Sequence, residues 1–181
     1  EITVSANYGI HEVAKTICVL NASEYGAIIN EGSVAAGGNV IFSDLSKLGV
    51  GTNWQNEIFH QAPIQTYNAS ARGGSDKMTY YVYGGYMGQA GIVGGGSKSN
   101  FNRINATSNL SFDLTSKLKL IVNTSFVNLK SQGVQENSFN SIIGSALNFD
   151  PTVSLYNTEP DVIGKYGYSN LLLSEIFNPL T

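Results

Sequence analysis

The clearest chemical pattern in this 181-residue sequence begins at His11, where a zinc-binding motif starts and is not completed. Metalloproteases carry the pattern His-Glu-x-x-His, which puts two histidines on one helix face with a glutamate as general base. Here His11 and Glu12 are followed by Lys15 in place of the second histidine. Since a catalytic zinc ion needs several protein ligands, we predict no metal site at this position.

A glycine-rich stretch at residues 91–99, Gly-Ile-Val-Gly-Gly-Gly-Ser-Lys-Ser, resembles a phosphate-binding loop. In such a loop the lysine directly follows the last glycine, and a helix N-terminus completes the cradle for the phosphate. Ser97 displaces Lys98 by one position, and strand patterns lie on both sides of the stretch. We therefore predict a flexible loop and no cofactor.

Two loop carboxylates, Asp150 and Glu159, invite comparison with the acid pair of a glycoside hydrolase. Pro151 and Pro160 lie beside them, and nothing in the sequence fixes the separation of the two carboxyl groups. We interpret both as solvated loop residues. Since no nucleophile, acid–base pair or metal cluster remains, the chain is predicted not to be an enzyme.

Aromatic residues in the same predicted loops allow two interpretations. Trp54 with Phe59, and Phe149 with Tyr156, could offer ring faces to a sugar, or they could hold the loops together. The sequence alone assigns no ligand-binding residue.

Composition narrows the class of protein. The net charge of −3 means that the chain lacks the excess of basic residues that is typical of nucleic-acid-binding proteins. Charged residues make up only 13% of the chain, about half the usual share, while 42% of residues are hydrophobic. This balance suits membrane-crossing strands with one face toward lipid and one toward water, and it also suits a soluble all-β domain. No apolar run reaches the about 20 residues of a membrane helix.

Five segments alternate between apolar and polar residues, as strands with two different faces do. They lie at about residues 2–10, 64–72, 78–89, 101–114 and 118–130. The fourth is the clearest: Ile104, Ala106, Leu110, Phe112 and Leu114 share one face, interrupted only by Ser108. Asn, Ser and Thr dominate its other face.

Short helices are predicted between the first two strands. Asn21 and Glu24 form a capping-box pattern at the start of one helix, which Gly32 is expected to end. A second short helix is expected within residues 52–59, capped by Thr52 or Asn53. The Gly73-Gly74-Ser75-Asp76 sequence is expected to form a tight turn.

The connections between the predicted strands alternate in length. They are long at residues 11–63, short at 73–77, medium at 90–100, short at 115–117 and long from 131 to 181. Short turns at one end of the strands and long loops at the other are typical of outer-membrane β-barrels. The sequence therefore favours a transmembrane sheet over a soluble sandwich.

Four stretches resemble, in order, the SusC/RagA family of TonB-dependent outer-membrane transporters. They are residues 20–25 (Leu-Asn-Ala-Ser-Glu-Tyr), 53–59 (Asn-Trp-Gln-Asn-Glu-Ile-Phe), 62–65 leading into 73–81, and 84–93. The resemblance is nearest to the starch-importing SusC type of Bacteroidetes. The motif residues are interpreted as structural: Leu20, Asn21, Glu24, Tyr25, Trp54, Glu57, Phe59, Gly73, Gly74, Tyr80, Tyr81 and Gly85.

This resemblance implies an all-β fold, part of a transmembrane antiparallel barrel of about 22 strands, with short helices in long extracellular loops. It implies import of glycans, starch or malto-oligosaccharides, across the outer membrane. The implied partners are a SusD-like surface lipoprotein and the TonB complex, which acts through a plug domain. The chain would be the N-terminal part of the barrel, and we expect a plug before residue 1 and about seventeen strands after residue 181.

Other functions remain open at this stage. RagA-like relatives import peptides, so a peptide importer is the first alternative. A passive porin or adhesin-type barrel and a soluble carbohydrate-binding β-domain are the others.

Overall fold

The structure, a computed structural model, describes residues 1–136, 138, 140–157, 165–172 and 176–181. The chain divides into two compact units. The sheet unit comprises residues 1–12 and 61–133, and the loop unit comprises residues 13–60 and 134–181. Each unit is described separately.

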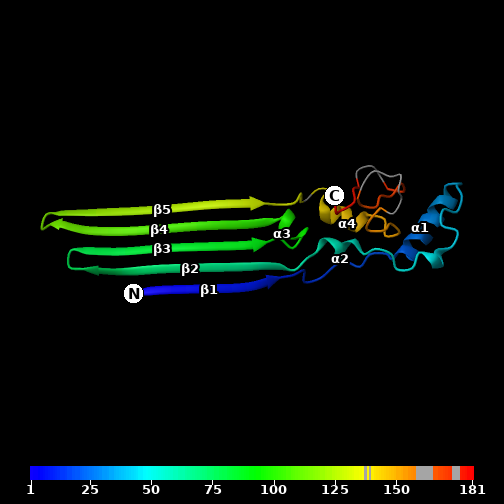
Figure 1. Cartoon of the computed structure of the whole chain (residues 1–181). Helices are drawn as coiled ribbons and strands as arrows, with labels where there is room; N and C mark the ends of the chain where they lie inside the picture. The colour runs from blue at the N-terminus through cyan, green and yellow to red at the C-terminus, as the bar shows by residue number, and fades with distance from the viewer. Residues whose placement is uncertain (137, 139, 158–164, 173–175) are drawn as a thin grey trace. The chain divides into compact units, whose positions relative to one another are not determined.

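The sheet unit is a single antiparallel sheet whose strands lie side by side in chain order (Figure 1). The five strands are β1 (Ile2–His11), β2 (Ala62–Ser75), β3 (Met78–Ala90), β4 (Asn100–Thr115) and β5 (Leu118–Gln132). Sequential antiparallel pairing is the topology of an up-and-down barrel wall. The prediction of a five-stranded antiparallel sheet is confirmed, and each strand lies within three residues of its expected bounds.

The strands are joined by two-residue turns at one end of the sheet, Asp76–Lys77 and Ser116–Lys117. The prediction that Gly73 and Gly74 form the first turn is wrong, because both continue β2 and pair with Tyr80 and Thr79. At the other end, the longer connections leave the sheet after β1, β3 and β5. We call these the turn end and the loop end.

The two faces of the sheet differ in chemistry. Cross-strand pairing places Val82 beside Ala71, Gly84 beside Ala106, and Ala106 beside Phe126, so these side chains share one apolar face. The opposite, polar face is rich in Asn, Ser and Thr: Thr3, Ser5, Asn7, Thr66, Asn68, Ser70, Asn105, Thr107, Asn109, Ser111, Asn123 and Ser125. Strand β5 departs from the pattern, since Ile121 and Val127 lie on the polar side.

Neither face of the sheet is packed into a core within the described chain. Among the residues of the five strands, only Ala62, Gly85 and Gly88 are buried. Ile104 remains 51% exposed and Phe126 55% exposed, although both are large apolar side chains. A soluble sandwich would bury such a face against a second layer. The sheet therefore presents an apolar face that needs a surrounding medium or partner.

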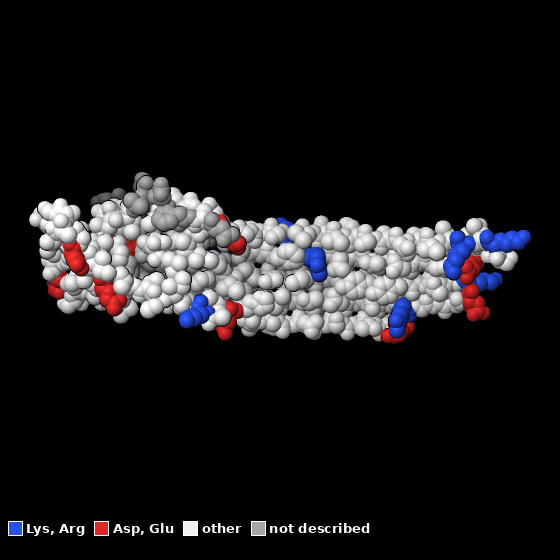
Figure 2. Space-filling model, turned by 180° about the vertical axis from the view of Figure 1, so that it is seen from behind, with Lys and Arg blue, Asp and Glu red and all other residues white. Residues whose placement is uncertain are grey.

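A band without any charged residue crosses all five strands. It comprises residues 2–10, 63–71, 78–90, 104–112 and 120–129. The stretch from Ile104 to Phe112 covers about 27 Å of strand, close to the apolar band of a tilted transmembrane barrel strand. Figure 2 shows charged side chains gathered at the turn end of the sheet and few along its length.

Two tyrosines lie side by side on the apolar face, in the last row before polar side chains follow toward the loop end. Tyr67 and Tyr86 stack with ring centroids 6.2 Å apart. The Tyr67 hydroxyl donates to Gln65 Oε1 at 3.3 Å, and the Tyr86 hydroxyl donates to Asn102 Oδ1 at 3.0 Å. Both acceptors lie nearer to the loop end than the tyrosines. In an interfacial aromatic girdle the rings lie on the apolar face and the hydroxyls point toward the water at the end of the strands. Tyr67 and Tyr86 have this arrangement, with their hydroxyls directed toward the loop end.

The loop unit contains the short helices that the sequence predicted. Helix α1 (Ala22–Ala35) begins at Asn21, whose Oδ1 accepts from the Glu24 amide while Glu24 Oε2 accepts from the Asn21 amide, both at 2.9 Å. The capping box is confirmed. The prediction that Gly32 ends this helix is wrong, because the left-handed residue that follows it is Gly37, with φ of 79°.

The remaining helices of the described chain are short. Helix α2 (Trp54–Ile58) begins at the cap Asn53, and η1 (Leu45–Lys47) is a 3₁₀ turn. Helix α4 (Ile142–Asn148), capped by Ser141, was not predicted. The glycine-rich stretch contains one helical turn, α3 (Gly95–Lys98), where the sequence predicted a loop without a helix. Among the described residues, no helix is both long and apolar enough to cross a bilayer.

Candidate functional site

The loop unit is organised around the indole of Trp54. Its exposed fraction is 2%, and its Nε1 donates to the Asp150 carbonyl oxygen at 3.0 Å. The ring of Phe149 meets it edge to face, with centroids 4.8 Å apart. Two segments 96 positions apart in sequence thus share one core. Because both rings are buried, they hold the loops together and have no free face for a sugar.

The carboxylate of Asp150 is buried, so the interpretation of this residue as a solvated loop carboxylate is wrong. Its exposed fraction is 1%. Oδ1 accepts from the Thr152 amide at 2.8 Å and from the Thr152 hydroxyl at 2.6 Å, and Oδ2 accepts from the Ser169 hydroxyl at 2.6 Å. These three donors satisfy the buried charge. Glu159, the other loop carboxylate that was interpreted as solvated, lies outside the described residues.

Further hydrogen bonds hold the first segment of the loop unit together and connect it to the second segment. The Gln55 side chain is buried and bonds to both backbone groups of Ile17, accepting from its amide at 2.9 Å and donating to its carbonyl at 2.7 Å. Thr52 donates its amide to the Pro151 carbonyl and its hydroxyl to the Val153 carbonyl. The long connections between the strands therefore fold into a defined structure.

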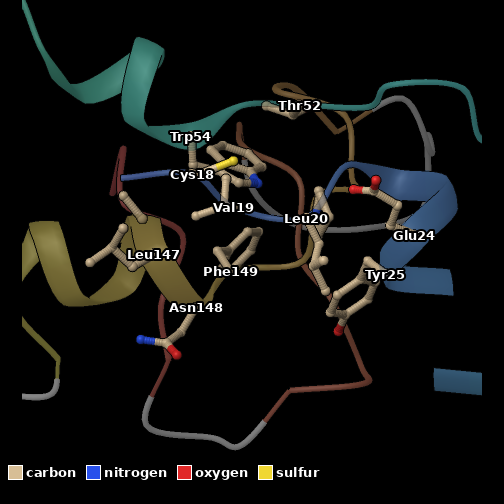
Figure 3. A pocket seen from close by; sticks show the side chains of 12 residues that line it. Cys18, Val19, Leu20, Glu24, Tyr25, Thr52, Trp54, Leu147, Asn148 and Phe149 are labelled. Carbon is tan, nitrogen blue, oxygen red and sulfur yellow. The ribbon is translucent and has the colours of Figure 1, made fainter. Parts of the chain in front are cut away.

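A cavity of about 530 Å³ opens next to this core (Figure 3). Four of the motif residues, Leu20, Glu24, Tyr25 and Trp54, line it together with Phe149. Other lining residues are Cys18, Val19, Thr52, Ala146, Leu147, Asn148 and Pro151. Burial raises the pKa of the Tyr25 phenol, and the charge of Asp150 raises it further, so the hydroxyl remains a donor. The motif at residues 20–25 thus shapes a pocket wall.

Two further motif residues of the loop unit lie in helix α2 or at its end. Glu57 is half-buried and lies in the first turn of the helix. Its negative charge there interacts favourably with the positive end of the helix dipole. Phe59 is the C-cap, with its amide bonded to the Gln55 carbonyl at 3.1 Å. Neither residue lines the cavity.

The motif glycines of the sheet provide space for neighbouring side chains. A Cβ on Gly73 would lie 2.7 Å from the Tyr80 hydroxyl, and one on Gly74 would lie 2.6 Å from the Met78 carbonyl. A Cβ on Gly85 would meet the oxygens of Tyr83, Asn105 and Asn68 within 3 Å. Tyr81 pairs with Arg72 on the polar face. These contacts support the structural interpretation of the sheet motif.

Hydrogen bonds cross the polar face beside Gly85. The Tyr83 hydroxyl donates to Asn68 Oδ1 at 2.7 Å, and Asn68 Nδ2 donates to the Ser5 hydroxyl at 3.2 Å. This row connects β1, β2 and β3 through uncharged groups. Such a surface suits contact with water or with a polar neutral molecule.

No cluster that could hold a metal ion occurs among the described residues. His11 is the last residue of β1 and pairs with Ala62. The described part of the chain therefore places the incomplete zinc motif at a strand end.

Gly51 provides a test of how closely the two loop segments must approach. Both Gly51 (φ 71°) and Gly49 (φ 60°) adopt left-handed backbone, but a Cβ on Gly51 would lie 2.2 Å from the Pro151 carbonyl oxygen. A Cβ on Gly49 would have no neighbour within 4 Å. Gly49→Ala should therefore cost about 1–2 kcal/mol of loop-unit stability, from backbone strain alone.

Gly51→Ala should cost about 1–3 kcal/mol more than Gly49→Ala, because the added methyl group overlaps fixed backbone. Protease resistance of residues 13–60 and 134–181 in the full-length protein measures the difference. Equal resistance of the two variants would mean that the close approach is not required.

Comparison with known proteins finds no matching family profile. Among curated proteins, the chain is 28% identical to TonB-dependent receptor P3 of Formosa agariphila over 187 residues, covering 98% of this chain and 17% of that protein. It is 30% identical to TonB-dependent receptor SusC of Bacteroides thetaiotaomicron over 159 residues, covering 87% of this chain and 15% of that protein. The chain thus spans about a sixth of the length of these relatives.

Solved structures give the same fold. The RagAB peptide transporter superposes with a TM-score of 0.65 at 18% identity, covering 83% of this chain and 20% of that chain. A second RagAB structure, of the peptide importer in a closed-closed state, gives a TM-score of 0.62. At this level of identity the likeness concerns the fold, and it agrees with a sheet that forms part of a barrel.

Proposed function

We propose that this chain, which belongs to the SusC/RagA family of TonB-dependent receptors, is part of an outer-membrane importer of glycans. It would form neighbouring strands and outer loops of that importer. Members of this family are outer-membrane proteins, and that is the location of this chain. The chain would provide part of the wall of a barrel of about 22 strands. The loop unit would form part of its extracellular surface.

The two-faced sheet is the observation that carries the proposal. Its apolar face has no covering layer in the described chain and is bordered by Tyr67 and Tyr86, whose hydroxyls point toward polar residues. Its polar face is lined by amides and hydroxyls. Lipid outside and water inside would satisfy both faces without a second layer. The closure of the sheet by further strands would remove its two unpaired edges.

Energy coupling and partners follow from the family rather than from residues of this chain. We propose that a plug encoded with the rest of the protein engages the TonB complex, and that a SusD-like surface lipoprotein covers the loop end. The plug would belong to the part of the relatives that this chain does not span. No nucleic acid, cofactor or enzymatic step belongs to this proposal.

The proposed cargo is a glycan, with malto-oligosaccharides as the first candidates. The many amide and hydroxyl side chains of the polar face and the similarity to SusC support a neutral cargo. A peptide cargo is the second candidate, because the RagAB peptide transporter has the same fold. A passive porin or adhesin-type barrel and a soluble carbohydrate-binding domain are the remaining alternatives.

Uptake measured in the native host tests the proposal. Cells lacking the full gene should lose uptake of labelled maltoheptaose, the complemented cells should regain it, and an uncoupler of the proton gradient should abolish it. If the cells lost only oligopeptide uptake, the protein would be a peptide importer and the glycan proposal would be wrong. Uptake that is insensitive to the uncoupler would indicate a passive channel, and detergent-free extraction of the protein would exclude the membrane assignment.

A further inference from the structure

Three tyrosines form an exposed aromatic surface in the second half of the loop unit. Tyr156 and Tyr166 are bridge partners on antiparallel segments, and their rings stack at 6.0 Å with an interplanar angle of 22°. Tyr168 lies two residues further along the same segment and lines one groove together with Tyr156. Tyr156 is 53% exposed and Tyr168 is 63% exposed. We call these three residues the tyrosine shelf.

The shelf is held in place by buried polar contacts. The Gly167 amide donates to the Leu155 carbonyl at 3.2 Å, and the Gly167 carbonyl accepts from the buried Asn178 side chain at 2.7 Å. A Cβ on Gly167 would lie 2.2 Å from the Ser154 carbonyl oxygen, so only glycine allows this approach. Ser169 connects the same segment to the buried Asp150 carboxylate. The backbone under the shelf is thus fixed on both sides.

A groove of about 280 Å³ lies beside the shelf, lined by Tyr156 and Tyr168 with the neutral residues Ser154, Asn157 and Asn170. Val153 and Gly167 complete its lining. Exposed aromatic rings next to hydroxyl and amide groups can contact a molecule that has an apolar face and many hydroxyls. The volume is close to the lower end of ligand pockets, about 300 Å³, so the groove has the size of a small subsite.

We propose that the tyrosine shelf is a glycan-binding subsite, in which a hexose ring stacks on Tyr156 or Tyr168 while the side chains of Ser154 and Asn170 bond its hydroxyls. This inference rests on the proposed function, because it specifies a contact of the imported cargo. The C–H face of the puckered hexose ring lies against a tyrosine ring face, and the hydroxyl and amide side chains of the groove match the sugar hydroxyls. The Lys165 ammonium lies over the Tyr156 ring, 6.0 Å from its centroid.

Exposed tyrosines are also common in protein–protein interfaces, so a protein partner is the alternative to a glycan at the tyrosine shelf. The groove favours the sugar. Val153 is the one aliphatic side chain among its described lining residues, so an aliphatic anchor of a partner would find little apolar surface there. The cavity beside Trp54 is a weaker candidate site, because the aromatic rings there are already buried against each other.

Binding of maltoheptaose to the purified full-length protein, measured by calorimetry, tests the shelf. Tyr156→Ala combined with Tyr168→Ala should weaken binding about tenfold or more, since aromatic stacking beyond simple burial accounts for up to about this factor per ring. The Tyr→Phe pair should retain most of the affinity because the ring faces remain. Phe177→Ala, which removes another ring of the loop unit with 54% exposure, should bind like the natural protein.

Each remaining outcome has a defined meaning. Unchanged maltoheptaose affinity in the alanine pair, with correct membrane insertion, overturns the subsite and leaves the importer proposal intact. Loss of association with the surface lipoprotein at unchanged sugar affinity makes the shelf a protein contact and also overturns it. If the natural protein binds oligopeptides and no oligosaccharide, the glycan proposal itself fails.

Discussion

Trp54→Ala is expected to unfold the loop unit while leaving the strands of the sheet intact. The substitution removes a fully buried indole, which costs about 3–5 kcal/mol. It also leaves the Asp150 carbonyl without its donor and the Phe149 ring without its edge-to-face partner. Because the indole packs within the loop unit, which is a compact unit distinct from the sheet, the loss should concentrate in residues 13–60 and 134–181.

Limited proteolysis of the full-length protein, followed by mass spectrometry, locates the effect. Cleavage should increase strongly within the loop unit, while the barrel keeps its heat-modifiable mobility in gels. Trp54→Phe should lose about 2–3 kcal/mol, less than Trp54→Ala, because a ring remains while the Nε1 hydrogen bond and part of the buried indole volume are lost. Val50→Ala, at a side chain with 76% exposure, is the surface control. If Trp54→Ala were cleaved no faster than Val50→Ala, the indole would not be the centre of the loop core.

The strands were predictable because their two faces meet different surroundings along their whole length. A period of two then appears directly in the sequence, as at Ile104, Ala106, Leu110 and Phe112. The turn between β2 and β3 was misplaced for a related reason. Gly73 and Gly74 indicate flexible backbone when considered alone, whereas the structure uses their missing side chains to fit Tyr80 and the Met78 backbone within the strand pair.

The loop unit could be predicted only in its local features. The capping box at Asn21 and the helix after Asn53 are encoded within a few residues. The burial of Asp150 depends on Ser169, and the burial of Trp54 depends on Phe149, so sequence distance conceals both. The resemblance to a family marked residues 20–25 and Trp54 as structural without showing that they meet at one cavity. Tyr156 was considered with Phe149, but its structural partner is Tyr166.

The second large effect concerns adjacent residues on opposite faces of β4, and it tests the assumption on which the assignment of lipid and water depends. Ala106 lies on the apolar face between Gly84 and Phe126, and a Cβ on Gly84 would have no neighbour within 4 Å, so a long side chain has space there. Ala106→Arg should therefore act through desolvation of the charge. Near the middle of a bilayer this costs about 2–4 kcal/mol.

Thr107→Arg places the same charge one residue further along, on the polar face between Tyr83 and Ser125. Water in the lumen would solvate it, so its effect on the free energy of unfolding should be close to zero. Urea unfolding of the full-length protein in lipid vesicles measures both variants. A larger loss for Thr107→Arg than for Ala106→Arg would reverse the two faces. Equal small losses would mean that neither face contacts lipid, because only hydrocarbon distinguishes a charge at position 106 from one at position 107.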